Sequence, residues 1–418
     1  MSDRNLQKIK ARLKLTAFCS LLSIILILPS IAAENNNNNN KKPNPTQFPP
    51  NPLEIRVRDP LLPRSSKDKR PLTDEEKATL APALDELNSE AAAKLQAGDE
   101  KGAFEIWYRE MRLRRYLGLL PEVRGLSRLG GIAWERNMPD DVQFISKRLE
   151  TIRQKELKSP VELNLLQALA TAFEQVRFPE SAVKVYEQIL ALNRPQQDTA
   201  KEEALLLKIG ELSFGAFDYP KAITAYQQLV DFAQKNGDRN KQVTYLKQLA
   251  YLYTKDSQLP KAIRTKQSLI ELYRNEKDFA QIPAVQLDIG TDYEAIGQLE
   301  QAAQTYQETY AFAWSIQLYS GAADALRKLI ALQVSQRQLE NAIAASQVLI
   351  QAEQLANNFY GLMNAYDEMG KLYVELKNYS QALEAYENGL EVAEELKYRE
   401  DYFERKIQQV ARERNLRG

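Results

Sequence analysis

Residues 206–229 read LLKIGELSFGAFDYPKAITAYQQL, and this stretch decides the fold. Apolar residues recur at helical intervals on both sides of a short break around Gly215, so we expect two amphipathic helices. The break contains Asp218, which can cap the second helix. It also contains Pro220, which suits a first helical turn because its missing N–H costs nothing there. The stretch therefore predicts a helix-turn-helix unit.

The unit recurs every forty residues. The position of Gly210 is small in five of six units, that of Ala222 is alanine in all six, and that of Tyr226 is aromatic in four. The three series are Ala170, Gly210, Ala250, Gly290, Ile330 and Gly370; Ala182, Ala222, Ala262, Ala302, Ala342 and Ala382; and Tyr186, Tyr226, Lys266, Tyr306, Ser346 and Tyr386. Weaker matches around Gly130 and Ala91 bring the total to eight units between about residues 84 and 395. A fixed period predicts a solenoid, in which each unit buries its apolar face against its neighbours.

The pattern resembles the tetratricopeptide repeat (TPR) family, as in Gly290-x2-Tyr293…Ala302-x3-Tyr306. The resemblance implies an all-α fold, a right-handed TPR superhelix of about eight helix-turn-helix repeats, whose concave groove binds other proteins. The forty-residue period exceeds the usual TPR length of about 34 residues. HEAT-like repeats share a period near forty and are the alternative, although they lack the Ala-x3-aromatic signature.

The chain divides into four predicted segments. These are a signal peptide at 1–33, an Asn/Pro-rich disordered linker at 34–71, a TPR solenoid at 72–397, and a C-terminal capping helix and tail at 398–418. The linker is too poor in apolar residues to fold, and we expect it to be a spacer or a docking segment.

The first 33 residues have the pattern of a Sec-type signal peptide: a basic start, an apolar run and a small-residue end. The pattern predicts export to the periplasm or another exported compartment. An uncleaved membrane anchor is the alternative. Cys19 follows the large Phe18 inside the apolar run, so we expect no lipid anchor.

The composition argues against several classes of function. Histidine is absent, which removes Ser-His-Asp and Cys-His catalysis and histidine-ligated zinc. Lys+Arg and Asp+Glu both number 56, so the balance of charge does not predict nucleic-acid binding. We therefore expect a protein that is not an enzyme, with a hydrolase based on a pair of carboxylates as the remaining catalytic alternative.

Candidate binding residues follow from the TPR resemblance, because set positions of the first helix face the groove in that family. On this register they are Lys247, Tyr251, Lys255, Glu294, Arg327, Asp367 and Lys371. Their mixed charge suits a polar peptide, such as an extended or C-terminal segment of a membrane or exported protein. The carboxylate clamp of some TPR domains is not expected, because Tyr251 stands where that pattern has asparagine.

No cofactor is required by these residues. Carboxylates alone can hold Mn²⁺ or Ca²⁺, and binding of such a metal, manganese in particular, is a hypothesis for two pairs of carboxylates. Asp288 and Asp292 lie one helical turn apart, and Asp140 and Asp141 share a turn. The overall architecture is similar to that of cyanobacterial exported TPR proteins, which include a periplasmic processing-associated factor for photosystem II. That similarity implies an assembly factor for D1 maturation and manganese supply. The alternative is a structural organiser of cell-envelope or outer-membrane machinery.

Overall fold

The computed structural model describes residues 51–55, 58–62 and 70–417. The predicted signal peptide and the first part of the predicted linker lie outside these residues. The described chain consists of helices and the turns between them, with no strand. None of its helices combines the length and the apolar character needed to cross a membrane.

The helices of the described chain form eight pairs, and we call the first member of each pair the A helix and the second the B helix. The pairs are α2 (Asp74–Gln96) and α3 (Glu100–Arg114), α4 (Leu119–Glu135) and α5 (Pro139–Thr151), α6 (Leu163–Gln175) and α7 (Pro179–Asn193), α8 (Thr199–Gly215) and α9 (Tyr219–Lys235), α10 (Arg239–Lys255) and α11 (Leu259–Glu276), α12 (Ile282–Ala295) and α13 (Leu299–Ser315), α14 (Tyr319–Ser335) and α15 (Leu339–Leu355), and α16 (Phe359–Glu375) and α17 (Tyr379–Leu396). A last helix, α18 (Glu400–Arg417), follows them.

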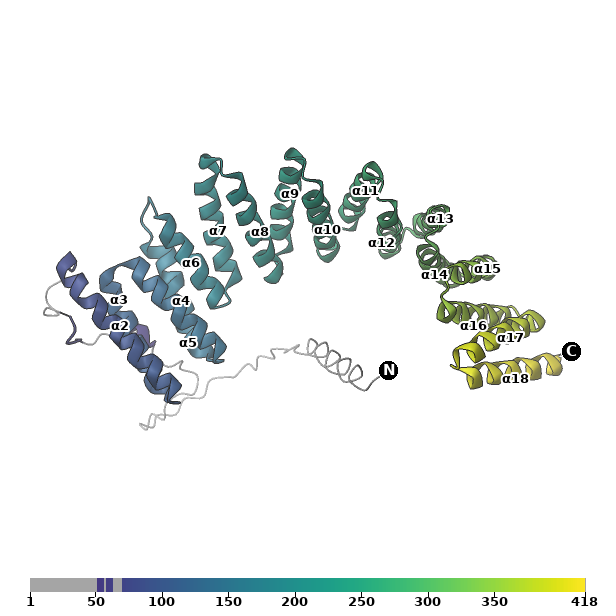
Figure 1. Ribbon diagram of the computed structural model, residues 1–418, viewed down its shortest axis with the longest axis horizontal. Coiled ribbons are helices and arrows are strands. Elements are labelled where there is room, and N and C mark those ends of the chain that lie inside the picture. Colours follow the sequence, from purple (N-terminus) through teal and green to yellow (C-terminus); the bar gives the residue numbers. More distant parts are fainter. Residues whose placement is uncertain (1–50, 56–57, 63–69, 418) are drawn as a thin grey trace, which may run out of the picture. The chain divides into compact units, whose positions relative to one another are not determined.

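Short helical turns lie beside these pairs, namely η1 (Pro52–Glu54), η2 (Arg115–Leu117), η3 (Ile152–Glu156), η4 (Arg194–Gln196) and η5 (Phe279–Gln281). The α-helices follow one another in chain order, and most pack chiefly on the helices before and after them (Figure 1). The predicted all-α solenoid of eight helix pairs is confirmed.

One type of turn joins most of the helices. At the end of α8, the Phe217 N–H donates to the Phe214 carbonyl at 3.0 Å and the Asp218 N–H donates to the Ser213 carbonyl at 2.9 Å. These two bonds form a Schellman motif around Phe217, whose φ is 60°. The Asp218 side chain then accepts from the Lys221 N–H at 3.2 Å and caps α9, as the sequence predicts.

The left-handed residue of this turn recurs at a spacing of twenty residues over most of the chain. It is Asn137, Arg177, Gln197, Phe217, Gly237, Ser257, Lys277, Gly297, Gln317, Arg337, Asn357, Lys377 and Lys397. Two turns of equal length per unit therefore produce the forty-residue period of the sequence.

The small residues of the A helices lie directly under the aromatic rings of the B helices. A Cβ atom would come within 2.8 Å of a ring carbon at Gly210, 2.3 Å at Gly290 and 2.7 Å at Gly370. In each case the ring belongs to the tyrosine sixteen residues later. The period of the sequence thus records a close helix–helix contact that has no room for a side chain on the A helix.

The part of the chain before α2 corrects the linker prediction for the residues that the structure describes. Leu53 in η1 is only 1% exposed and belongs to the core formed with α3. Asp59 pairs with Arg109 of α3 at 2.7 Å. The prediction of disorder is therefore wrong for residues 51–55 and 58–62. Leucines and a charged residue of these two short segments have partners on the first helix pair.

The C-terminal helix α18 occupies the stretch for which the sequence predicts a capping helix. Phe403 and Val410 are buried against the last helix pair, and most of the charged residues of α18 are exposed. The helix covers the apolar face of α17 and presents a polar face to solvent, which suits the end of a solenoid.

One carboxylate links the B helices of successive repeats near the N-terminal end. Glu150 of α5 accepts a hydrogen bond from Arg153 Nε at 2.9 Å and another from the hydroxyl of Ser181 in α7 at 3.2 Å. These hydrogen bonds, with that from Arg153 as the largest cause, lower the pKa of Glu150 to about 2.

Candidate protein-binding surface

A group of exposed and half-buried side chains, four aromatic rings and one lysine, lies where α8, α9 and α10 meet, and we call it the aromatic cluster. It consists of Phe214, Phe217, Tyr219, Tyr251 and Lys255. Phe217 is 75% exposed and Tyr251 is 44% exposed. Phe217 is held outward because it is the left-handed residue of the turn, so its side chain leaves the helix axis on the solvent side.

The members of the aromatic cluster contact one another in a continuous series. The ring centroids of Phe214 and Tyr251 lie 5.9 Å apart, those of Phe214 and Tyr219 6.2 Å, and those of Phe217 and Tyr219 6.3 Å. Lys255 Nζ lies 5.2 Å from the centroid of Tyr251. Edge-on contacts between rings are favourable, and so is a cation above a ring. The result is an ordered apolar surface, rimmed by a positive charge, that spans two successive repeats.

Three of the predicted binding residues share one face of α10. Lys247, Tyr251 and Lys255 lie four residues apart and all are exposed. Two of them belong to the aromatic cluster, and Lys247 Nζ lies 5.8 Å from the ring of Tyr273 on α11. The structure therefore brings these three predicted residues together on one surface.

Glu294 serves a contact within its own helix pair. It accepts a hydrogen bond from the hydroxyl of Tyr306, whose ring is fully buried. The same pairing occurs three units earlier, where the Tyr186 hydroxyl donates to Glu174 at 2.5 Å. Burial raises the pKa of Tyr306, so the hydroxyl keeps its proton as donor. Glu294 is thus a residue that fastens its A helix to its B helix.

Arg327 is engaged with a buried carboxylate. It forms an ion pair with Glu353 of α15, which is 1% exposed, and a second one with Asp324 at 2.5 Å. Asn358 donates to the same Glu353 carboxylate at 2.8 Å. A charge at this depth requires such partners, so Arg327 has a structural role.

Asp367 and Lys371 attach the terminal helix. Asp367 is 3% exposed and accepts from the Tyr402 hydroxyl of α18 at 2.9 Å. Lys371 Nζ lies 3.1 Å from Asp367, and Arg399 lies 3.5 Å from it. Both predicted residues therefore take part in the packing of α16 against α18.

One carboxylate of each pair named for manganese has a partner within the protein. Asp292 is buried and pairs with Lys266 Nζ at 2.7 Å, and burial raises the pKa of Asp292. Asp141 accepts a hydrogen bond from Tyr108. Within the described chain no group of three or more acidic or cysteine side chains could hold a metal ion.

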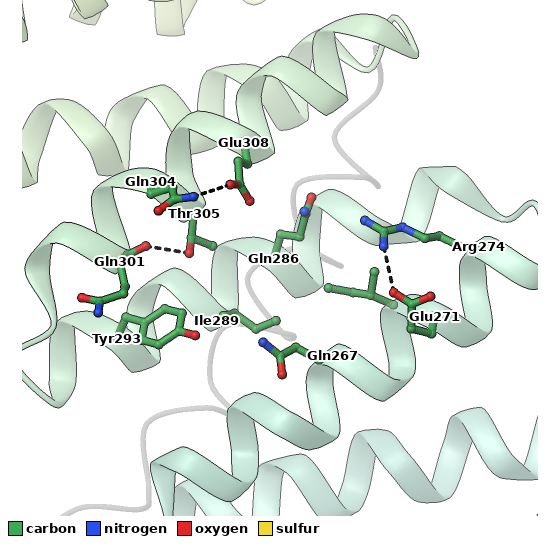
Figure 2. Close-up of a pocket in the computed structure, with 11 residues that line it drawn as sticks. Gln267, Glu271, Arg274, Gln286, Ile289, Tyr293, Gln301, Gln304, Thr305 and Glu308 are labelled. Carbon is green, nitrogen blue, oxygen red and sulfur yellow. Dashed lines mark hydrogen bonds and ion pairs between the residues drawn. The ribbon is translucent and has the colours of Figure 1, made fainter.

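A cavity of ≈ 430 Å³ lies between α11, α12 and α13 (Figure 2). Glutamine side chains from all three helices line it, together with Ile289 and Tyr293 of α12. It is separate from the aromatic cluster, which involves α8, α9 and α10. Of the residues that line this cavity, Tyr293 belongs to the repeat pattern quoted above. The glutamines could not be predicted as a site, because glutamine on a helix surface is common.

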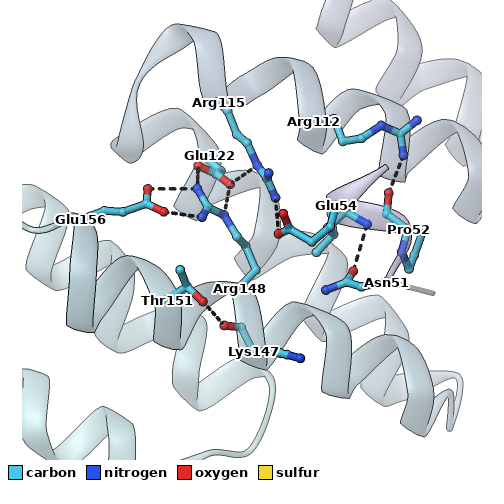
Figure 3. A network of polar contacts seen from close by, with 11 residues as sticks. Asn51, Pro52, Glu54, Arg112, Arg115, Glu122, Lys147, Arg148, Thr151 and Glu156 are labelled. Atoms are coloured by element: carbon cyan, nitrogen blue, oxygen red, sulfur yellow. Dashed lines mark hydrogen bonds and ion pairs between the residues drawn. The ribbon is translucent and has the colours of Figure 1, made fainter. Parts of the chain in front are cut away.

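A cluster of paired charges near the N-terminal end, in which Glu122 and Arg148 are buried, is structural (Figure 3). Glu122 of α4 accepts from Arg148 of α5 at 2.6 Å and from Arg115 of η2 at 2.9 Å. Arg148 also pairs with Glu156 of η3, and Arg115 reaches Glu54 of η1 at 3.3 Å. Each of these charges has a partner of opposite sign, and the pairs join five helical elements.

Phe214, Phe217 and Tyr219 are not among the residues predicted from the TPR register. A signal for them exists in the sequence, because three aromatic residues stand within the six positions 214–219. Turn residues are usually polar, so exposed aromatic side chains at a turn indicate an interaction surface.

Comparison with known proteins gives neither a matching family model nor a matching curated protein. Among solved structures, a putative kinesin light chain with TPR-like repeats from Podosopora anserina is 15% identical, with 47% of this chain and 97% of that chain covered and a TM-score of 0.34. BtubC from P. vanneervenii is 14% identical, with 52% of this chain and 92% of that chain covered and a TM-score of 0.36.

Aspartyl phosphate phosphatase F from Bacillus subtilis is 15% identical, with 70% of this chain and 82% of that chain covered and a TM-score of 0.38. At such identities and TM-scores these likenesses say nothing of what the chain binds. By its own helix pairs and turns, the protein is an all-α solenoid of TPR-like repeats.

Proposed function

We propose that this protein is a non-catalytic scaffold that binds a segment of another protein on the aromatic cluster. The observation that carries the proposal is the exposure of Phe217 and Tyr251 in a contiguous set of rings. Exposed aromatic patches of this kind are typical of protein interfaces, where aromatic residues supply much of the binding energy.

The chemistry of the cluster suggests the kind of segment that it binds. Burial of a phenylalanine or tyrosine side chain contributes about 1.5–3 kcal/mol, so the two exposed rings favour apolar side chains on the partner. Lys247 and Lys255 lie on the same helix face and favour a carboxylate beside those side chains. An extended or C-terminal segment can meet both requirements at once.

The proposal extends to an exported protein, because the pattern of residues 1–33 is that of a signal peptide. The similarity of architecture to cyanobacterial exported TPR proteins supports a role in the assembly of photosystem II, at the maturation of D1. Manganese binding is not included, since the described carboxylates do not fit it. The alternative is that the same scaffold acts as a structural organiser of the cell envelope.

The test is affinity capture from the native membrane fraction, with three forms of the full chain as bait. They are the natural chain, a Phe217→Ser/Tyr251→Ser variant, and a Phe359→Ser/Tyr360→Ser variant as matched control. Phe359 and Tyr360 are 47% and 55% exposed on α16, outside the aromatic cluster. Two anchors of about 2 kcal/mol each predict at least a tenfold loss of partner for the first variant.

Equal recovery of partner with the cluster variant and the control would contradict the proposed surface. The identity of the captured protein separates the two finer readings. A single membrane protein with an exposed terminus would favour an assembly factor, and a set of envelope proteins would favour a structural organiser.

A further inference from the structure

A polar groove lies between the B helices α11 and α13, and α12 forms its floor (Figure 2). We call it the glutamine groove after Gln267 of α11, Gln286 of α12, and Gln301 and Gln304 of α13. Its volume is ≈ 430 Å³. It involves none of the residues of the aromatic cluster.

The wall formed by α13 is one face of that helix. Gln301, Gln304 and Glu308 follow one another at intervals of three and four residues, which places them in a row. Seven residues of helix extend over about 10 Å, because each residue rises about 1.5 Å. A stretch of about three residues in an extended chain has the same length. The wall therefore matches a short extended segment.

Amide side chains suit the backbone of such a segment. Each glutamine offers one acceptor oxygen and two N–H donors, and an extended backbone alternates N–H and C=O groups. The Oε1 atom of Gln286 is buried and finds no hydrogen-bond partner within the described protein. Buried acceptors are nearly always satisfied, so this amide would gain a hydrogen bond if its side chain turned into the groove toward a donor of a bound segment.

The charge of the groove selects further among peptides. Arg274 pairs with Glu271 of the same helix at 2.8 Å, so those two charges compensate each other. On the opposite wall, Glu308 accepts from the Gln304 side chain at 2.8 Å, and no cation of the described chain pairs with it. The lining residues thus carry one carboxylate that is free to meet a positive charge.

We propose that the glutamine groove binds an extended peptide segment that carries a lysine or arginine opposite Glu308. The amides contact the backbone of the segment, and the carboxylate fixes its register by pairing with the basic side chain. A neutral carbohydrate would use the amides equally well but would leave Glu308 unpaired, so the carboxylate favours a peptide. The site is independent of the aromatic cluster and adds a second contact to the scaffold.

The test uses a display library of random twelve-residue peptides, selected on the full natural chain. We expect the selected peptides to be enriched in lysine or arginine at one position. Their binding should fall at least tenfold with Glu308→Lys and with Gln304→Ala, both of which change exposed side chains. Glu300→Lys is the matched control, since it reverses an exposed charge on α13 outside the groove and should leave binding unchanged.

Two results would overturn the inference. One is a selection without basic enrichment, or one in which binding withstands Glu308→Lys and Gln304→Ala, with helix content checked by circular dichroism. The other is binding of oligosaccharides from a glycan array in the absence of any peptide. Peptides that bind the Phe217→Ser/Tyr251→Ser variant as well as the natural chain would support the groove, while peptides lost with that variant would belong to the aromatic cluster.

Discussion

Gly290 of α12 offers a direct test of how the helix pairs pack. The Cβ atom of an alanine at this position would lie 2.3 Å from Cε1 and 2.7 Å from Cδ1 of Tyr306. The tyrosine ring is fully buried and its hydroxyl donates to Glu294, so it cannot move aside without losing contacts. We therefore expect Gly290→Ala to destabilise the protein, although alanine is the better helix former.

The size of the effect follows from three contributions. Overpacking of a well-filled site costs about 1–3 kcal/mol. Loss of a hydrogen bond to a charged acceptor costs about 1.5–3 kcal/mol, and the higher helix propensity of alanine offsets about 1 kcal/mol. The free energy of unfolding should thus fall by about 1.5–5 kcal/mol.

The assay is hydrogen exchange followed by mass spectrometry, because repeat arrays open locally as well as globally. Peptides from α12 and α13 should exchange faster in Gly290→Ala, and the urea midpoint should fall. The matched control is Gly215→Ala, since no atom lies within 4 Å of a Cβ at the end of α8. It should be as stable as the natural chain, or more so by up to about 1 kcal/mol. If Gly290→Ala behaves like this control, the inferred contact between glycine and ring is wrong.

Three further changes have defined outcomes. Arg327→Met should lower the unfolding free energy by about 1–3 kcal/mol in a urea titration, because it removes the ion pair of the buried Glu353 carboxylate and leaves that carboxylate with the Asn358 amide; the range allows for the partial exposure of the arginine. Lys328→Met should change the unfolding free energy by less than about 0.5 kcal/mol in the same titration. Gln317→Gly should raise it by about 0.5–1 kcal/mol, because φ is 60° there, and an unchanged urea midpoint would count against strain at the turn. Glu150 has a pKa lowered from 4.5 to about 2, so its stabilising effect is complete above about pH 4.5 and is lost as the pH falls toward 2. Glu150→Gln should therefore flatten the decline of the melting temperature over that range, as measured by circular dichroism, and a parallel decline in both proteins would refute the linkage.

The repeat pattern was sufficient to predict the helix pairs because their closest contacts are local in sequence. Gly290 and Tyr306 belong to adjacent helices, so one period contains both partners. The repeat that departs from this pattern keeps the side-chain volume between its two helices balanced. Ile330 stands there in place of the glycine, and Ser346 in place of the tyrosine. Where Lys266 replaces the ring, it pairs with the Asp292 carboxylate of the next A helix.

The free residues of the surface could not be predicted in the same way. Whether an A-helix residue is available depends on partners on other helices: Arg327 is occupied by a carboxylate of its B helix 26 residues later, and Asp367 by a tyrosine of α18 35 residues later. Lys247, Tyr251 and Lys255 are exposed, and their contacts in the described chain are with aromatic rings rather than with buried charges. The TPR register fixes the side of the helix, and only the packing of neighbouring helices decides which of its side chains are free.

The constant length of the turns has a consequence for changes in the number of repeats. A duplication or deletion of forty residues restores the same left-handed joint at both cut ends, as at Phe217 and Ser257, and leaves every later helix facing its neighbour as before. An insertion of one residue within a helix instead rotates all that follows by about 100° and turns the small residues away from the rings. The array can therefore gain or lose whole units at little structural cost, so its reach can change while its surfaces stay intact.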